Sequence, residues 1–146
     1  MTVRVQSGDF DTGAEIERFS NGNGRVGAVC SFVGLVRGDG SVGAMTLEHY
    51  PGMTERQLEA IEAEARRRWP LEDALIVHRY GRLEVGDRIV LVVTASAHRE
   101  AAFQSCNFLM DWLKTKAPFW KVEHTREGDA WVDAKDGDDS LAARWD

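Results

Sequence analysis

The chain has 146 residues and a composition ordinary for a soluble globular protein, 43% hydrophobic and 29% charged. This length predicts one domain, residues 1–146, with a sizeable core. The net charge of −6 argues against general nucleic-acid binding, because phosphate backbones require a basic face. No apolar run has the length of a membrane span, and no secretory signal is expected. The two cysteines, Cys30 and Cys106, show no metal-type spacing, so we expect buried free thiols and a cytoplasmic location.

The first 24 residues predict a short strand at 3–5, a weak helix at 11–19 and a loop rich in glycine and asparagine. The loop contains Gly22-Asn23-Gly24-Arg25-Val26-Gly27, which matches the dinucleotide fingerprint GxGxxG. That motif binds nucleotides where it follows a strand and opens a helix, whereas here it precedes a strand. Nucleotide binding is therefore not assigned to it.

Residues 25–36 predict a valine-rich strand that runs into a glycine-containing loop. Arg37 lies where the strand opens into this loop, which is a common place for ligand contacts. On the residues alone, a solvated loop arginine is an equal alternative. Residues 44–50 predict the next strand, and Pro51-Gly52 closes it.

A first long helix is predicted to begin at Thr54, because Thr54-Glu55-Arg56-Gln57 matches the S/T-x-x-E/Q capping box. Pro70 is expected to stop it. Its buried stripe is predicted to comprise Leu58, Ile61, Ala65 and Trp69. Its solvated face is predicted to include Glu62, Glu64, Arg66 and Arg67. We interpret this helix as structural.

Further strands are predicted at 75–79 and 88–94, with a short one at 83–85. The chain is expected to end in a hairpin of strands 120–125 and 130–134. Because strands and helices alternate only partly, we expect an α+β fold. It should have a mostly antiparallel sheet, two main helices and a C-terminal β-hairpin, in place of a doubly wound arrangement.

The second long helix is predicted over residues 96–116. Its apolar stripe comprises Ala102, Cys106, Leu109, Met110 and Leu113. Pro118 ends the helix, because the residue before a proline is pushed out of the α region. Lys114 and Lys116 then lie in the last turn, where the helix dipole favours cations. Lys121 follows the break, at the start of a strand.

Three lysines thus fall within eight residues, around the stiff apolar segment Pro118-Phe119-Trp120. Crowded ammonium groups disfavour one another's charge, and desolvation acts in the same direction. One lysine could therefore act as a neutral amine, either as a nucleophile or as a proton carrier. Alternatively, all three stay charged and bind an anion, and the dipole alone is an adequate reason for a lysine at a helix C-terminus.

At the other end of this helix, Ser96 is the expected N-cap, which puts His98 and Arg99 in the first turn. Cations there oppose the dipole, whereas free backbone N–H groups favour an anion that Arg99 could grip. The alternative is that both side chains reach solvent or Glu100. His98 and Lys114 are about 24 Å apart on one helix. If both ends serve one substrate, the pocket is shared between subunits, so we predict a homodimer with composite sites.

Other chemistries lack support in the sequence. The four histidines form no HExxH motif or His/Cys cluster, so metal catalysis is not expected. GxSxG and P-loop motifs do not occur. Cys106 falls on the apolar stripe of the second helix and is interpreted as a core residue rather than a nucleophile.

Four motifs together carry a resemblance to a known family. They are Phe32-x-Gly34-x-Val36-Arg37, Leu47-Glu48-His49-Tyr50-Pro51-Gly52-Met53, Ser96-Ala97-His98-Arg99 and Leu113-Lys114-Thr115-Lys116-Ala117-Pro118-Phe119-Trp120-Lys121. Through these motifs, between residues 26 and 131, the chain closely resembles the MoaE family, the large catalytic subunits of molybdopterin synthase.

The resemblance implies an enzyme of molybdenum cofactor biosynthesis with an α/β-hammerhead-like fold. Members of the family transfer sulfur from the C-terminal thiocarboxylate of a small ubiquitin-like carrier subunit of the MoaD type. The acceptor is cyclic pyranopterin monophosphate, and the product is the dithiolene of molybdopterin. The family works as a heterotetramer around a central homodimer, with the carrier's glycine tail inserted into the large subunit. The large subunit needs no metal or separate cofactor.

Carried over by position, the resemblance implies that Lys114 and Lys121 are catalytic and lie beside the carrier's terminal glycine. Lys114 is expected closest to the acyl carbon, with Lys121 assisting proton transfer or holding the anion. The implied substrate-binding residues are Leu35, Val36, Arg37, His98, Arg99, Lys114, Lys121, Val122 and Glu123. Leu35 and Val122 stand where the family often has basic residues, so contacts there would be made by the backbone.

Two rival functions remain open from the sequence. One is a non-catalytic, anion-binding partner subunit whose lysines bind charge only; it would bind the carrier's tail and form no dithiolene. The other is a lysine-dependent Schiff-base enzyme acting on a phosphorylated carbonyl compound. In that case, borohydride would trap the substrate on Lys114.

Overall fold

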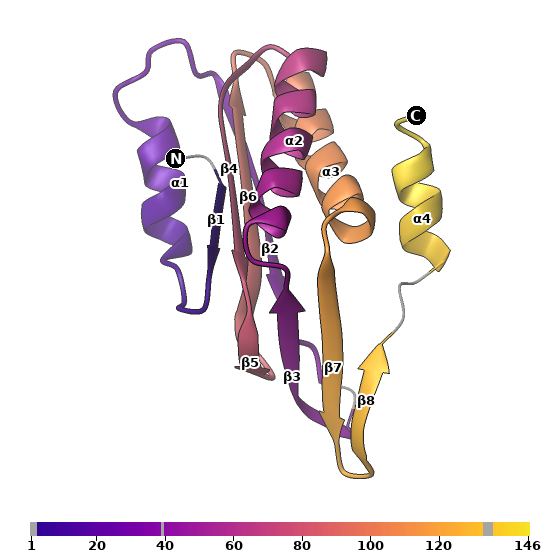
Figure 1. Cartoon of the computed structure of the whole chain (residues 1–146). Helices are drawn as coiled ribbons and strands as arrows, with labels where there is room; N and C mark the ends of the chain where they lie inside the picture. Colours follow the sequence, from indigo (N-terminus) through magenta and orange to yellow (C-terminus); the bar gives the residue numbers. More distant parts are fainter. Residues whose placement is uncertain (1–2, 39, 133–135) are drawn as a thin grey trace.

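The computed structural model of the chain describes residues 3–38, 40–132 and 136–146. Over these residues the chain forms two four-stranded sheets and four helices (Figure 1). The strands are β1 (Val3–Gln6), β2 (Ala28–Leu35), β3 (Val42–His49), β4 (Leu71–Arg79), β5 (Gly81–Glu84), β6 (Arg88–Ser96), β7 (Phe119–Thr125) and β8 (Gly128–Val132). The helices are α1 (Thr12–Ser20), α2 (Met53–Arg68), α3 (Arg99–Lys116) and α4 (Asp136–Ala143).

One sheet has the strand order β1-β4-β6-β2, and the other has the order β5-β3-β7-β8. All of these strand pairs are antiparallel except β1 with β4. The predicted α+β class, with mostly antiparallel strands and the C-terminal hairpin β7–β8, is therefore confirmed. The last strand was expected to reach residue 134, but residues 133 and 134 lie outside the described residues. No described helix is both long and apolar enough to cross a membrane.

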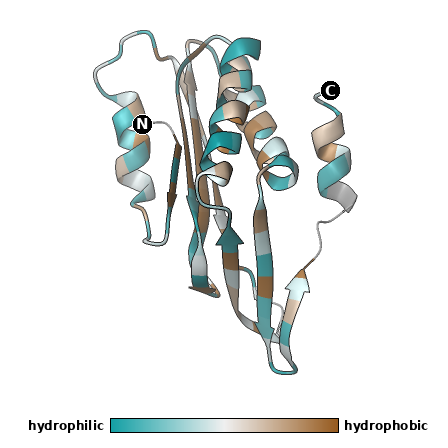
Figure 2. Cartoon of the chain, in the orientation of Figure 1, coloured by the Kyte–Doolittle hydropathy of each residue, from teal (hydrophilic) through white to brown (hydrophobic). Residues whose placement is uncertain are grey.

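Strands β4 and β6 form the centre of the first sheet and bury both of its faces. Ile76, Val90 and Val92 belong to the core cluster shared with α2 and α3. The alternate residues belong to the cluster shared with α1: Leu75, Val77, Leu91 and Val93. Successive side chains of a strand point to opposite faces, so the unbroken apolar runs suit strands covered on both sides. Figure 2 shows these strands brown over much of their length.

Helix α2 begins two residues away from the expected cap. Its N-cap is Gly52, with φ of 85°, and the Glu55 carboxylate accepts a hydrogen bond from the Gly52 N–H (3.2 Å). Thr54 lies inside the first turn, where its hydroxyl oxygen accepts from the Tyr50 N–H (2.9 Å). The prediction that Thr54 caps this helix is therefore wrong, because the left-handed glycine closes the preceding turn first.

The buried stripe of α2 is confirmed at Leu58, Ile61 and Ala65. The fourth predicted member, Trp69, is instead the C-cap of the helix and is half-buried. One residue of the predicted solvated face is buried, because Glu62 is only 7% exposed. Its carboxylate accepts from the Arg66 guanidinium one turn later, and this pairing compensates its loss of water.

Helix α3 begins later than expected and ends as predicted. Ser96 is the last residue of β6, and its hydroxyl donates to the Pro70 carbonyl oxygen (2.8 Å), so the expectation that Ser96 is the N-cap is wrong. His98 occupies the cap position, without a side-chain hydrogen bond to the helix. The helix stops at Lys116, and Ala117 is extended before Pro118, as the proline requires.

The glycine-rich loop before β2 has a packing role. It connects α1 to β2, so it precedes a strand as predicted. A Cβ at Gly27 would lie 2.2 Å from the Ala97 carbonyl oxygen, and the Gly27 N–H donates to the Ser96 carbonyl oxygen. The glycine is needed here because two backbone segments approach closely.

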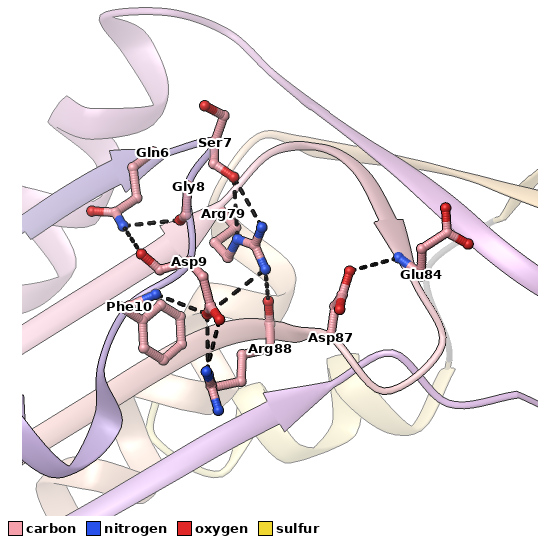
Figure 3. A network of polar contacts seen from close by, with 9 residues as sticks. All are labelled: Gln6, Ser7, Gly8, Asp9, Phe10, Arg79, Glu84, Asp87 and Arg88. Atoms are coloured by element: carbon pink, nitrogen blue, oxygen red, sulfur yellow. Dashed lines mark hydrogen bonds and ion pairs between the residues drawn. The ribbon is translucent and has the colours of Figure 1, made fainter.

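A polar network fastens the segment before α1 to the strands beneath it (Figure 3). Arg88 donates from Nε and Nη2 to the Asp9 carboxylate at 3.0 and 2.7 Å. This hydrogen bonding holds the pKa of Asp9 below its usual value. Arg79 donates to the carbonyl oxygens of Ser7 and Arg88. The network therefore ties the loop between β1 and α1 to β4 and β6.

Helix α4 was not predicted. It is formed by the acidic C-terminal segment and packs against α3 (Figure 1). The buried Asp111 carboxylate of α3 accepts from Arg144 Nη2 (2.7 Å) and Trp145 Nε1 (2.6 Å). These two bonds hold the C-terminal end of the chain on α3.

Candidate functional site

The last turn of α3 carries Lys114 and Lys116, and only one of them faces the candidate site. Lys114 is exposed and lines a cavity beside the second sheet. Lys116 Nζ lies 4.4 Å from the centroid of the Trp112 ring, a cation–π contact outside that cavity's described lining. The expected cluster of three lysines is therefore reduced to two at this site.

The proline break turns the chain from α3 straight into β7. The Pro118 carbonyl oxygen accepts from the Thr54 hydroxyl of α2 (3.0 Å), which pins the turn. Phe119 follows and stacks on the ring of His78, with centroids 3.7 Å apart and planes 18° from parallel. Lys121 lies two residues further, opposite Leu47 of β3 and Val132 of β8. Its place as the third residue of β7 confirms the predicted location at a strand start.

Lys114 and Lys121 open into one cavity of about 300 Å³. Two further described residues of its lining are titratable, His78 and Asp138. The remaining lining is apolar and comprises Met45, Leu47, Ile89, Leu113, Ala117, Phe119 and Val132. A mostly apolar pocket with a few convergent polar groups is the usual form of a small-molecule site.

His78 is the buried titratable group of this cavity, only 4% exposed on β4. Burial, together with a smaller effect of the nearby positive charge of Lys114, lowers the pKa of His78 to about 3. Its Nδ1 lies 2.8 Å from the Arg79 carbonyl oxygen, which can only accept, so Nδ1 carries the proton. The imidazole is therefore neutral at physiological pH, with Nε2 as a hydrogen-bond acceptor.

Asp138 brings a carboxylate from α4 into the lining of the same cavity. Its position could not be predicted from the sequence, because the acidic C-terminal segment carries no helix signal strong enough to place it. His78 was also missed, although a histidine inside the apolar run of residues 75–78 is a signal that could have been followed.

The residues at the start of α3 lie away from the cavity. His98 is the N-cap and Arg99 the first helical residue, and both are exposed. Lys114 lies sixteen residues beyond His98, which corresponds to about 24 Å along the helix. Arg37 is exposed just beyond the end of β2, and it too lies outside the described lining of the cavity.

The remaining expected substrate contacts also lie outside that described lining. Leu35 is exposed at the end of β2, whereas the Val36 side chain is buried in the core of the second sheet. The Val36 N–H donates to the Asp87 carbonyl oxygen. Val122 and Glu123 follow Lys121 along β7 and are half-buried.

The two cysteines are free thiols, as expected, but the expected burial holds only for Cys106, because Cys30 on β2 is half-buried. Cys106 is buried on α3, and burial raises the pKa of its thiol well above the usual range. A thiol held in the protonated form is a poor nucleophile, which agrees with the interpretation of Cys106 as a core residue. Over the described residues, no group of three or more His, Cys, Asp or Glu side chains is placed to hold a metal ion.

Comparison with known proteins gives a consistent set of similarities. The sequence model of the family described as MoaE protein matches residues 5–116. The molybdopterin synthase catalytic subunit of Pseudomonas aeruginosa is 55% identical over 149 residues, covering 100% of this chain and 99% of that protein. The structure of molybdopterin cofactor biosynthesis protein E from Burkholderia multivorans matches with a TM-score of 0.85 at 56% identity, covering 99% of this chain and 95% of that one. The crystal structure of molybdopterin synthase from Staphylococcus aureus matches with a TM-score of 0.81 at 30% identity, covering 89% of this chain and 96% of that one.

Proposed function

The chain belongs to the MoaE family, and from this membership we propose that it is the catalytic subunit of a molybdopterin synthase. The observation that carries the proposal is the meeting of Lys114 and Lys121 in one cavity. They come from opposite sides of the break at Pro118. A cavity in which two amines converge among apolar side chains suits an anionic acyl group.

The proposed reaction is a sulfur transfer. The sulfur donor is the C-terminal thiocarboxylate of a small ubiquitin-like carrier subunit, and the acceptor is cyclic pyranopterin monophosphate. Lys114 lies closest to the acyl carbon of the carrier's terminal glycine, and Lys121 assists proton transfer or holds the anion. The name of the relatives, catalytic subunit, supports the existence of a further subunit in the assembly. A cytoplasmic location is also part of the proposal, because free thiols are typical of a reducing compartment.

The proposed working unit contains a dimer of this chain with two composite sites. Lys114 and Lys121 come from one subunit, and His98 and Arg99 come from the other, because one α3 holds its two ends too far apart for a single pocket. Exposed apolar side chains on β2 and α3, two elements in contact, support a buried interface there: Phe32, Leu35 and Phe103. Arg37 is assigned to the substrate's phosphate, while Leu35, Val36, Val122 and Glu123 remain predicted contacts.

Lys114→Ala tests the catalytic role. We expect product formation to fall about a thousandfold, because the proton carrier next to the acyl carbon is lost. Dimerisation should be unchanged, because the apolar side chains of the proposed interface, Phe32, Leu35 and Phe103, stay in place. The assay supplies thiocarboxylated carrier and pterin precursor, and it measures dithiolene product by chromatography.

Lys116→Ala is the matched control, since this lysine lies in the same helical turn but over Trp112. It should retain near-normal turnover. Near-normal turnover of Lys114→Ala would refute the proposed role. Carrier binding by the wild type without any dithiolene product would instead favour a non-catalytic, anion-binding subunit.

A further inference from the structure

One residue of the cavity, His78, has no role in the proposed reaction of the two lysines. His78 comes from β4 of the first sheet, whereas the lysines come from α3 and β7. All three residues line the same cavity. A polar side chain in a mostly apolar lining costs solvation free energy unless it finds a partner.

Two contacts fix the orientation of the His78 ring. Nδ1 donates to the Arg79 carbonyl oxygen at 2.8 Å. One face of the ring lies against Phe119 at a centroid distance of 3.7 Å. Because Nδ1 is used in this way, Nε2 is the nitrogen that remains for the cavity, and its lone pair accepts.

The groups around His78 favour a donor as its partner. Among the described residues, the charged or titratable groups that share its cavity are Lys114 on α3, Lys121 on β7 and Asp138 on α4. His49 on β3 also acts on the charge of the imidazole. The positive charge of Lys114 acts directly on the imidazole. An ammonium group has three N–H donors, so Lys114 can donate to Nε2 in addition to any other acceptor.

We propose that His78 is a positioning residue whose neutral Nε2 accepts a hydrogen bond from Lys114 and aims that amine at the reacting acyl group. The inference rests on the proposed function, because it assigns the hydrogen bond to the catalytic lysine. A stacked, backbone-anchored ring restricts the flexible lysine side chain more firmly than solvent would. As a consequence, His78 sets the direction of the Lys114 amine.

This role predicts a separation of kinetic effects. His78→Phe keeps a ring against Phe119 but removes the acceptor, so kcat should fall about ten- to a hundredfold. The KM for the pterin should change little, because His78 acts through Lys114 rather than on substrate. In the pH profile of kcat, the limb that reflects the titration of Lys114 should move to lower pH, because the ammonium form of Lys114 loses a hydrogen bond. A purely structural role would leave this limb in place.

The matched variants are His78→Gln and His124→Phe. Glutamine restores an amide acceptor and donor, so it should recover most of the lost kcat and move the pH limb back. His124 on β7 bonds to Thr46 of β3 and Asp129 of β8 and lies outside the described lining of the cavity, so its replacement should leave both quantities unchanged. Wild-type kcat and an unshifted limb in folded His78→Phe would overturn the inference. Absence of product from the wild type would instead overturn the proposed function.

A second measurement requires no His78 variant to fold. In ¹⁵N-resolved NMR spectra, wild-type His78 should show a protonated Nδ1 and an unprotonated, hydrogen-bonded Nε2. Lys114→Met should shift the Nε2 resonance toward that of a free acceptor, whereas Lys116→Met should not. A protonated Nε2, or an Nε2 resonance insensitive to Lys114→Met, would contradict the proposal.

Discussion

His78 shows how a single buried side chain links stability to the site. Burial lowers the pKa of His78 to about 3, and the usual value is 6.5. Between these values the unfolded chain binds a proton at this position and the folded chain does not. The contribution of His78 to folding is therefore fully present above pH 6.5 and is lost as the pH falls toward 3.

The first prediction concerns acid sensitivity. Lowering the pH from 7 to 5 should reduce the free energy of unfolding by about 2 kcal/mol through this histidine alone, at about 1.4 kcal/mol per pH unit below 6.5. Urea unfolding of the wild type and of His78→Phe at both pH values isolates the effect, because other titrating groups are common to the two proteins. Equal pH dependence in the two proteins would show that His78 is not buried in the neutral form.

For single residues, the sequence predicted features that depend on local rules, whereas features that depend on distant packing could not be predicted. The proline and the helix end predicted three lysines around Pro118, and the family resemblance selected Lys114 and Lys121 from them. His78 could not be paired with them, since 36 positions along the chain separate it from Lys114. Only the tertiary fold, in which α3 packs on β6, the neighbour of β4, brings the imidazole to the amine. The burial of Glu62 was also missed, because a charged residue on a helix face gives no local sign that it will be shielded.

At the scale of elements, α3 and α4 show different degrees of predictability. The apolar stripe and the proline stop gave the body and end of α3, whereas its start at Arg99 was misjudged because Ser96 bonds to Pro70 in the neighbouring segment. The acidic sequence of α4 has little intrinsic reason to be helical. Its placement depends on Asp111, a residue of another helix that holds Arg144 and Trp145.

The second prediction addresses this C-terminal attachment. Asp111→Ala should reduce the free energy of unfolding by about 2 kcal/mol, because a buried carboxylate with charged and indole donors is removed. Urea unfolding followed by circular dichroism measures the loss. Asp139→Ala, at an exposed position on α4, is the control and should change stability by no more than about 0.5 kcal/mol. Equal stability of the two variants would show that the Asp111 bonds do not stabilise the fold.

At the scale of the whole molecule, the two sheets share their packing, which supports the proposal that residues 1–146 are one domain. Ile89 packs against both the core of the first sheet and that of the second. The cavity lies where they meet, since His78 belongs to the first sheet and Lys121 to the second. Within one copy of the chain, the two ends of α3 lie too far apart to share a pocket. This separation is the physical reason for the proposed composite site.

The most direct test of that claim is complementation between two inactive subunits. Lys114→Ala and Arg99→Ala subunits, carrying different affinity tags, are co-expressed, and the mixed dimer is isolated through both tags. If each site combines Lys114 of one subunit with Arg99 of the other, the mixed dimer has one intact site and one doubly defective site. Its product formation should therefore recover to about half that of the wild-type dimer. Activity no higher than that of the two parent variants would contradict the composite site.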